Sequence, residues 1–227
     1  LELQDGKTRY FNGFISRLGL SGTSERFTHY QAELVPWLWF LTRTADCRIF
    51  QDLSVPDIIT KLFKDLGFSD YRLALQGNAD KREYCVQYRE TDFNFVSRLM
   101  EEEGIFYYFE HADGKHTLVF ADDSGIYKNC PGKSDVKFAP EGGYGEREDY
   151  ISSWQEQQEL RPGLVTLWDH NFQMPPKNLE SKSPTTIKVG GNDRFEIYDF
   201  PGGYSQRFNK PDARLGSVEP EGSSMVR

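Results

Sequence analysis

Residues 35–41 form the centre of the hydrophobic pattern, because these seven positions carry no charge and lie between Glu33 and Arg43. A stretch this short cannot cross a bilayer, which needs ~20 apolar residues. Read as a strand, it carries apolar side chains on both faces: Val35, Trp37, Trp39 and Leu41 on one, and Leu38 and Phe40 on the other. A strand of this kind is buried on both sides, by the domain core or by another subunit.

Helical spacing begins after a second short strand that we predict over 47–50. Ser54 is a suitable N-cap, Pro56 fits a first turn, and Gly67 is a natural stop. The pattern therefore predicts a helix between Ser54 and Gly67. Its apolar stripe consists of Ile58, Ile59, Leu62, Phe63 and Leu66.

A second amphipathic helix is predicted over 92–103, with Thr91 as its cap and Gly104 as its stop. This helix ends in Glu101, Glu102 and Glu103, which places like charges at the negative end of the helix dipole. Two interpretations are open. The carboxylates are solvated, or a Lys or Arg from elsewhere in the assembly meets them.

Alternating patterns predict strands on both sides of these helices. Asp113-Gly114 is a hairpin turn signal between two of them. Residues 67–80 read as irregular, and 123–148, rich in Gly and Pro, as a linker. The chain therefore divides into a β region, an α+β region over about 54–127, and a second β region from about 150. The predicted strands are 7–17, 28–34, 84–88, 105–111, 116–122, 151–160, 165–169, 185–189 and 195–200.

The composition favours a β-rich protein and argues against a nucleic-acid-binding protein. Aromatic residues make up 15% of the 227 positions and favour strands. The net charge is −8, whereas a nucleic-acid footprint is basic. The three cysteines form no close pair, which indicates a reducing compartment during folding. No signal peptide or membrane span is present, but Leu1 is not a start Met, so we expect a fragment.

No motif for catalysis, cofactor or metal binding stands out. The sequence has no GxSxG elbow, no phosphate-binding loop and no GxGxxG. His111 and His116 are expected to be two solvent-exposed hairpin residues rather than metal ligands. Asp122 and Asp123 are weak candidates for one half of a glycosidase pair, and Cys47 for a nucleophile without an identified base.

The predicted strands are rich in aromatic residues, and no reactive motif accompanies them. This combination favours a scaffold or interaction protein. Two strands that are apolar on both faces fit a subunit of a ring, with one face for its own core and one for a neighbour. A helix of the same chain covering the second face fits equally well, and the residues alone leave both possibilities open.

Five strings, in order and over nearly the whole chain, resemble the VgrG spike proteins of type VI secretion systems. The resemblance is very specific. The strings are PWLWFLTRTADCRIFQDLSVPDIITKLF, YCVQYRETDFNFVSRLMEEEGIFYYFEH, HTLVFADD, LRPGLVTLWDHNFQMP and FPGGYSQRF.

The resemblance implies an α+β, predominantly β fold with two tube-protein-like β-barrel domains and an α+β insertion. On this basis 1–53 is part of the first barrel, 54–127 the insertion, 128–150 a linker and 151–227 the second barrel, without the C-terminal needle. It also places one group of residues in the core or near a trimer contact: Val35, Trp37, Trp39, Ile105, Tyr107 and Phe109.

The implied function is structural and needs no cofactor. A homotrimer would adapt the hexameric Hcp tube to a threefold needle, contact baseplate components, and meet a PAAR tip protein through the needle. Nucleic-acid binding and stable membrane insertion are not expected. Assembly would take place in the bacterial cytoplasm, followed by secretion through the type VI apparatus. The alternatives are a phage or prophage tail hub, an envelope-degrading glycosidase, and a carbohydrate-binding module.

Overall fold

The computed structural model describes residues 2, 6, 8–77, 79–129, 135–140, 150–172 and 175–205. These residues form mostly β structure with two α-helices, as predicted, although the described strands close no barrel. The elements are β1 (Phe14–Thr23), β2 (Thr28–Val35), η1 (Trp37–Arg43), β3 (Ala45–Phe50), α1 (Val55–Asp65), β4 (Tyr71–Ala74), β5 (Cys85–Thr91), α2 (Asp92–Glu103), β6 (Phe106–Ala112), β7 (Lys115–Ala121), η2 (Ser124–Ile126), β8 (Lys137–Phe138), β9 (Tyr150–Ile151), β10 (Leu164–Leu167), β11 (Ser181–Pro184), η3 (Asn192–Arg194) and β12 (Glu196–Asp199).

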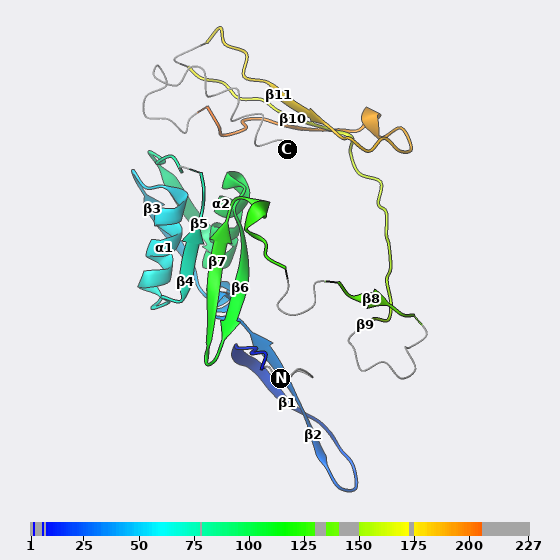
Figure 1. Ribbon diagram of the computed structural model, residues 1–227. Helices are drawn as coiled ribbons and strands as arrows, with labels where there is room; N and C mark the ends of the chain where they lie inside the picture. The colour runs from blue at the N-terminus through cyan, green and yellow to red at the C-terminus, as the bar shows by residue number, and fades with distance from the viewer. Residues whose placement is uncertain are drawn as a thin grey trace.

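Strands β3 to β7, both α-helices and η1 share the main hydrophobic core (Figure 1). The strands form two small sheets, β3–β5 and β4–β7–β6. Apolar side chains from η1, α1, α2 and β7 form one buried cluster with Phe50 of β3 and Cys85 of β5, so the core draws on both sides of the expected boundary at 53/54. We call this body the α+β unit.

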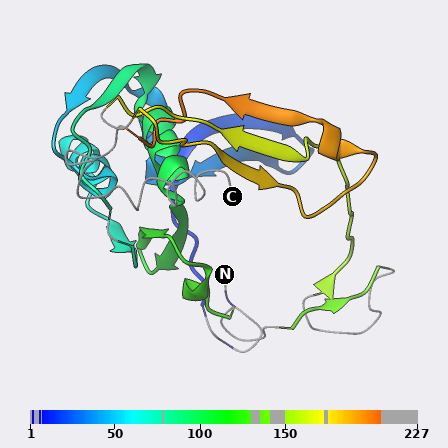
Figure 2. The same cartoon turned by 90° about the horizontal axis from the view of Figure 1, so that it is seen from above.

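Two other parts extend from the α+β unit. The β1–β2 hairpin projects at one end, and β10–β12 form a separate three-stranded sheet (Figures 1 and 2). The chain reaches this sheet through residues 152–162, which are exposed and carry no strand. The strand predicted over 151–160 is therefore wrong beyond its first residue.

The strand predicted over 35–41 is also wrong, because Trp37–Arg43 form a 3₁₀ helix. Its buried residues are Trp37, Leu38 and Leu41, which lie on one side of a helical turn rather than on alternate faces of a strand. Trp37 stacks on Phe68 with ring centroids 4.7 Å apart and meets the edge of Phe63 at 4.9 Å. A helix of the same chain thus covers this stretch.

Both predicted α-helices are confirmed with their caps. Ser54 and Asp57 form a capping box at the start of α1, and Gly67 follows its C-cap with a φ of 81°. Thr91 accepts a hydrogen bond from the backbone N–H of Asn94 at the start of α2. Gly104 ends α2 in the left-handed region, where glycine is not strained.

The strands of the α+β unit follow the prediction, with one exception. β3 covers the strand predicted over 47–50, β5 overlaps the strand predicted over 84–88 from Cys85 onward, and β6 and β7 pair antiparallel around Asp113-Gly114. The exception is β4, which pairs parallel with β7 inside the stretch predicted to be irregular. β4 is a short edge strand, so its pattern is weak.

The first hairpin is displaced from its predicted position. In place of the strand expected over 7–17, the structure has β1, which begins at Phe14 and runs beyond residue 17 to Thr23. Register shifts between Ile15 and Arg17 and between Leu20 and Gly22 break its alternation, and each shift changes which positions face one side. The pattern therefore concealed the second half of the strand.

The last β region differs more. β10 and β12 lie within or beside the predicted strands at 165–169 and 195–200, but 185–189 is no strand. There the side chain of Asn192 accepts a hydrogen bond from Val189 N (3.2 Å) and donates one to Ile187 O (3.1 Å), which replaces strand pairing. β11, which lies between the strands predicted over 165–169 and 185–189, pairs with β10 instead. Most of the predicted linker and everything after residue 205 lie outside the described residues.

Replacement of Trp37 by Ala should lower the free energy of unfolding by about 3–5 kcal/mol. The side chain is only 3% exposed and packs on two aromatic rings. Urea unfolding checks this, with Trp154→Ala, at a side chain 73% exposed, as the matched control. A loss at Trp37 no larger than at Trp154 would contradict this account of the core.

Candidate interaction surfaces

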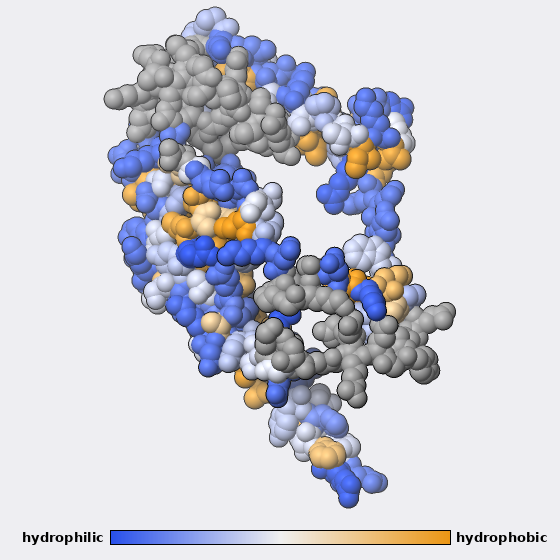
Figure 3. All heavy atoms as spheres, in the orientation of Figure 1, coloured by the Kyte–Doolittle hydropathy of each residue, from blue (hydrophilic) through white to orange (hydrophobic). Residues whose placement is uncertain are grey.

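The β1–β2 hairpin carries a bare apolar face. The β-ladder places Ile15 opposite Leu34, Leu18 opposite Ala32, and Leu20 opposite Tyr30. Residues directly opposite each other share a face, so these six form one surface, the apolar hairpin face. Its five larger side chains are between 53% and 69% exposed. The hairpin projects freely at the lower end of Figure 3.

The other face of the hairpin is mainly polar. Arg17 lies opposite Glu33, with an N–O distance of 4.0 Å, and Gly19 lies opposite Gln31. An apolar face combined with a polar face is typical of a sheet that packs on one side. An isolated two-stranded hairpin is marginally stable in water, so the apolar hairpin face is the surface most in need of a partner.

The base of the hairpin is tied to the β6–β7 turn by four residues, which we call the histidine joint: Asn12, Trp37, His111 and His116. The backbone N–H of Asn12 donates to Nδ1 of His111 (3.0 Å), and that of Trp37 donates to Nε2 of His116 (3.1 Å). The Asn12 amide also donates to the carbonyls of Ala112 (2.7 Å) and Lys115 (2.9 Å). Both ends of the hairpin are therefore held against the α+β unit.

His116 corrects the expectation of two exposed histidines, because it is only 8% exposed. Burial, followed by the charge of His111, lowers its pKa, and Asp70 opposes this shift. A neutral imidazole can accept the Trp37 hydrogen bond on Nε2. The described residues contain no group of three His, Cys, Asp or Glu side chains placed to hold a metal ion.

The residues expected in the core or near a trimer contact lie in different environments. Val35 and Trp37 are buried, and Ile105 and Phe109 are half-buried against the core. Trp39 is half-buried under the guanidinium of Arg43, 4.1 Å from the ring centroid, and Tyr107 is 36% exposed. The structure brings Phe109 and Trp37 together around His116.

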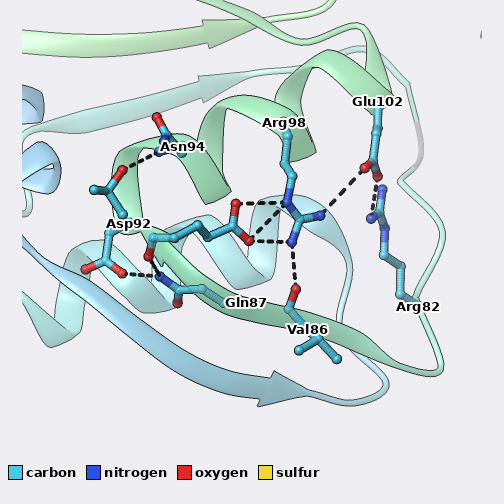
Figure 4. Close-up of polar contacts among 9 residues, drawn as sticks. Arg82, Val86, Gln87, Asp92, Asn94, Arg98 and Glu102 are labelled. Atoms are coloured by element: carbon cyan, nitrogen blue, oxygen red, sulfur yellow. Dashed lines mark hydrogen bonds and ion pairs between the residues drawn. The ribbon is translucent and has the colours of Figure 1, made fainter.

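Arginines of the same chain meet the acidic end of α2 (Figure 4). Arg82 contacts Glu102 and Glu103, each at 2.7 Å. Arg98 binds Glu90 at 2.7 Å and lies 3.7 Å from Glu102. Burial disfavours the charged Arg82 side chain, but its contacts with Glu103 and Glu102 raise its pKa overall. This network differs from both interpretations of the acidic helix end, because arginines of the same chain, rather than water or another subunit, contact the carboxylates.

Figure 4 also shows how β5 is fixed to the start of α2. The fully buried Asp92 accepts a hydrogen bond from the Gln87 side chain (2.6 Å), and Arg48 lies 3.8 Å from its other oxygen. Arg98 reaches across to the carbonyl of Val86 (2.6 Å). These contacts use polar side chains to hold strand and helix together.

The two carboxylates considered for glycoside hydrolysis bind backbone instead. Asp122 accepts hydrogen bonds from the N–H groups of Gln76 (2.9 Å) and Gly77 (2.8 Å), and Asp123 accepts one from Gly125. Although its partial burial raises the pKa of Asp122, these backbone bonds lower it overall. A glycosidase acid needs a raised pKa, so this pair does not fit that chemistry.

Beside β10 lies a pocket of about 540 Å³, lined in part by Trp168, Tyr198 and Phe200. The rings of Trp168 and Phe200 stand at 69° to each other, not in the flat row expected of a carbohydrate platform. Tyr204 is buried nearby and donates its hydroxyl hydrogen to the Leu179 carbonyl. Burial raises the pKa of Tyr204 to about 12.

The apolar hairpin face was not predicted from the sequence. Alternation of Tyr30, Ala32 and Leu34 was a usable signal in β2, but the irregular β1 ladder hid the matching residues. The histidine joint was not predicted either, because its hydrogen-bonded residues lie 99 and 79 positions apart. No local pattern marks such a contact.

Among the described residues, no helix has the length and apolar character needed to span a membrane.

Comparisons with known proteins give a consistent result. The family model for the phage tail baseplate hub (GPD) matches residues 1–226. The chain is 46% identical over 207 residues to the type VI secretion system spike protein VgrG1c of Pseudomonas aeruginosa, and 44% identical over 206 residues to VgrG1b of the same organism. Each match covers 91% of this chain and 28% of the relative. The chain thus spans less than a third of these relatives, and the resemblance to VgrG proteins is confirmed.

A solved structure supports the same relationship. The E. coli c3393 protein is a component of the type VI secretion system with structural similarity to the T4 bacteriophage tail proteins gp27 and gp5. Its structure matches with a TM-score of 0.51 and 30% sequence identity. The match covers 53% of this chain and 35% of that one.

Replacement of Arg82 by Gln should destabilise the protein by about 2 kcal/mol, because it removes the guanidinium that contacts both Glu102 and Glu103 at the negative end of α2. Urea unfolding measures the loss. Adding Glu102→Gln and Glu103→Gln to the Arg82→Gln variant should recover part of it, since the two carboxylate charges at the end of the helix are then gone. Lys61→Gln, in an exposed i,i+4 pair with Asp65, is the control and should cost below about 0.5 kcal/mol. Equal effects at Arg82 and Lys61 would contradict the network.

Proposed function

The chain belongs to the phage tail baseplate hub family, and from this premise we propose that it forms the trimeric base of a type VI secretion spike. Its relatives at 44–46% identity are type VI spike proteins. In this proposal, 1–53 contribute to a first tube-like barrel and 151–227 to a second, with 54–127 as an α+β insertion and 128–150 as a linker. Three such subunits present six similar domains to a hexameric tube.

The structural observation that carries the proposal is the apolar hairpin face. Five large apolar side chains on this face are more than half exposed. Such a cluster is unfavourable in contact with water, but it offers a surface on which a neighbouring copy of the chain can pack. In a threefold ring each subunit uses two different surfaces, so the hairpin of one copy packs on another part of the next. The proposed trimer contact therefore includes the hairpin, with Val35, Trp37, Trp39 and the 105–109 strand close to it.

The proposed mechanism is mechanical. Contraction of an outer sheath supplies the free energy, while the base supplies stiffness and converts the sixfold symmetry of the Hcp tube to the threefold symmetry of a needle. Hcp, baseplate components and, through the needle, a PAAR tip protein are the proposed partners. The protein would assemble in the bacterial cytoplasm and leave through the apparatus. No step requires an enzyme site or a cofactor.

A phage or prophage tail hub is the second candidate, because the family is named for the phage protein. The strong matches to several type VI spike proteins favour the secretion system. The two candidates share a fold and a threefold assembly, so assembly alone does not separate them.

We expect the chain to be a trimer of the 26.3 kDa subunit in light scattering over a concentration series. Leu18→Glu places a charge in the apolar hairpin face and should shift the mass toward the monomer. Gln31→Glu adds the same charge to the opposite face of the same hairpin and should leave the trimer intact. A monomer at all concentrations, or equal effects of the two variants, would contradict a threefold contact at the hairpin.

The secretion function is tested separately in Pseudomonas aeruginosa. A strain lacking VgrG1a, VgrG1b and VgrG1c receives VgrG1c with its matched 207 residues replaced by those of this chain. We expect this chimera to restore release of Hcp into the medium, and the same chimera with Leu18→Glu to fail. A well-expressed chimera that releases no Hcp would speak against the secretion assignment and favour the phage hub.

A further inference from the structure

We propose that the histidine joint is a pH-sensitive connection that fixes the orientation of the β1–β2 hairpin on the α+β unit while its imidazoles accept hydrogen bonds, and loosens that orientation when protonation removes an acceptor. This inference does not depend on the proposed function. It rests on the position of two imidazole acceptors at the two places where the chain enters and leaves the hairpin.

The geometry explains why these two hydrogen bonds matter together. Asn12 lies two residues before β1, and Trp37 lies two residues after β2. Each donates its backbone N–H to one imidazole nitrogen of the β6–β7 hairpin. His111 and His116 are cross-strand partners beside the turn, with ring centroids 5.9 Å apart. One turn of the α+β unit therefore holds both ends of the projecting hairpin.

Protonation of an imidazole removes its hydrogen-bond acceptor. An imidazolium has N–H groups on both nitrogens and no free lone pair, so it meets the N–H groups of Asn12 and Trp37 donor against donor. Two adjacent positive rings also repel each other. Contacts that do not use an imidazole acceptor remain. They include the hydrogen bonds of the Asn12 amide to the Ala112 and Lys115 carbonyls, the edge contact of Phe14 with Phe40 at 5.2 Å, and the buried side chain of Trp37.

The charged groups around the joint modulate this response. Lys115, the first residue of β7, pairs with Asp70 at 2.9 Å, and Asp70 favours the charged form of His116. Glu110, next to His111, pairs with Arg72 at 2.8 Å. On the hairpin side, Arg9 lies over the ring of Phe11, which contacts His111 at a centroid distance of 6.0 Å. The strands and the N-terminal segment thus contribute charges of both signs, and η1 contributes Arg43 on its far turn.

The direction of the effect follows from His116. Its folded-state pKa lies below the ordinary value because burial and His111 disfavour the charge. The stabilisation it gives is therefore present above the unfolded-state pKa of about 6.5 and is lost as the pH falls through the lower folded-state pKa. Because the apolar hairpin face is carried by this hairpin, acidification would free its orientation relative to the α+β unit.

Backbone amide exchange, corrected for the intrinsic effect of pH, tests the proposal on the full chain. Between pH 7.5 and pH 5 the protection of the Asn12 and Trp37 amides should fall about tenfold or more, which corresponds to loss of one net hydrogen bond. Amides in α1 and α2 should keep their protection, which separates release of the hairpin from global unfolding.

Matched variants decide whether the two imidazoles are responsible. In His111→Asn and His116→Gln, a side-chain carbonyl takes the place of the accepting nitrogen but does not titrate, so the double variant should stay protected at pH 5. His29→Gln, at an exposed histidine far along the same hairpin, should behave as wild type. Unchanged protection of the wild-type amides at pH 5 would overturn the proposal, as would a pH-dependent loss that persists in the double variant.

Discussion

The structure depends first on the burial of η1 between the two α-helices and the β4–β7–β6 sheet. Trp37, Leu38 and Leu41 enter the core from one side of this short helix. Since η1 directly follows β2, burying it fixes where the projecting hairpin leaves the α+β unit. The hairpin then needs only the contacts of the histidine joint to define its direction. The packing of η1 in the α+β unit thus positions the apolar hairpin face, although this face contributes little to the core of the unit.

The helices could be predicted to within a residue because their signals are local. Ser54 with Asp57, and Thr91 with Gly104, fix caps through neighbours within a few positions. The Asp113-Gly114 turn likewise defined the β6–β7 hairpin. For residues 35–41, a run of bulky apolar side chains is compatible with either a strand or a buried helix. Only the shape of the surrounding core, formed by distant residues, selects the helix.

The interaction surfaces were harder to predict for a related reason. Bulges in β1 interrupt the period of two that marks a half-buried strand, although Leu18 and Leu20 lie on the same face as Tyr30. In the last β region, the side chain of Asn192 satisfies backbone groups that a strand would otherwise pair. His116 looked like an exposed turn residue because its partner, Trp37, is remote in sequence. Such features follow from tertiary contacts and leave no periodic trace.

The contacts that hold the chain together divide into rigid and adjustable ones. The α+β unit is held by a continuous apolar core and by the Arg82 and Arg98 ion pairs, all within one chain. The hairpin is oriented on it by the ring contact of Phe14 with Phe40 and by a few directional hydrogen bonds, whose energies are about 1 kcal/mol each. Subunit packing against the apolar hairpin face would add far more than this, since it would bury five large side chains. The assembly, rather than the isolated chain, would therefore determine how stiff the hairpin is, and its orientation can be adjusted before neighbouring copies fix it.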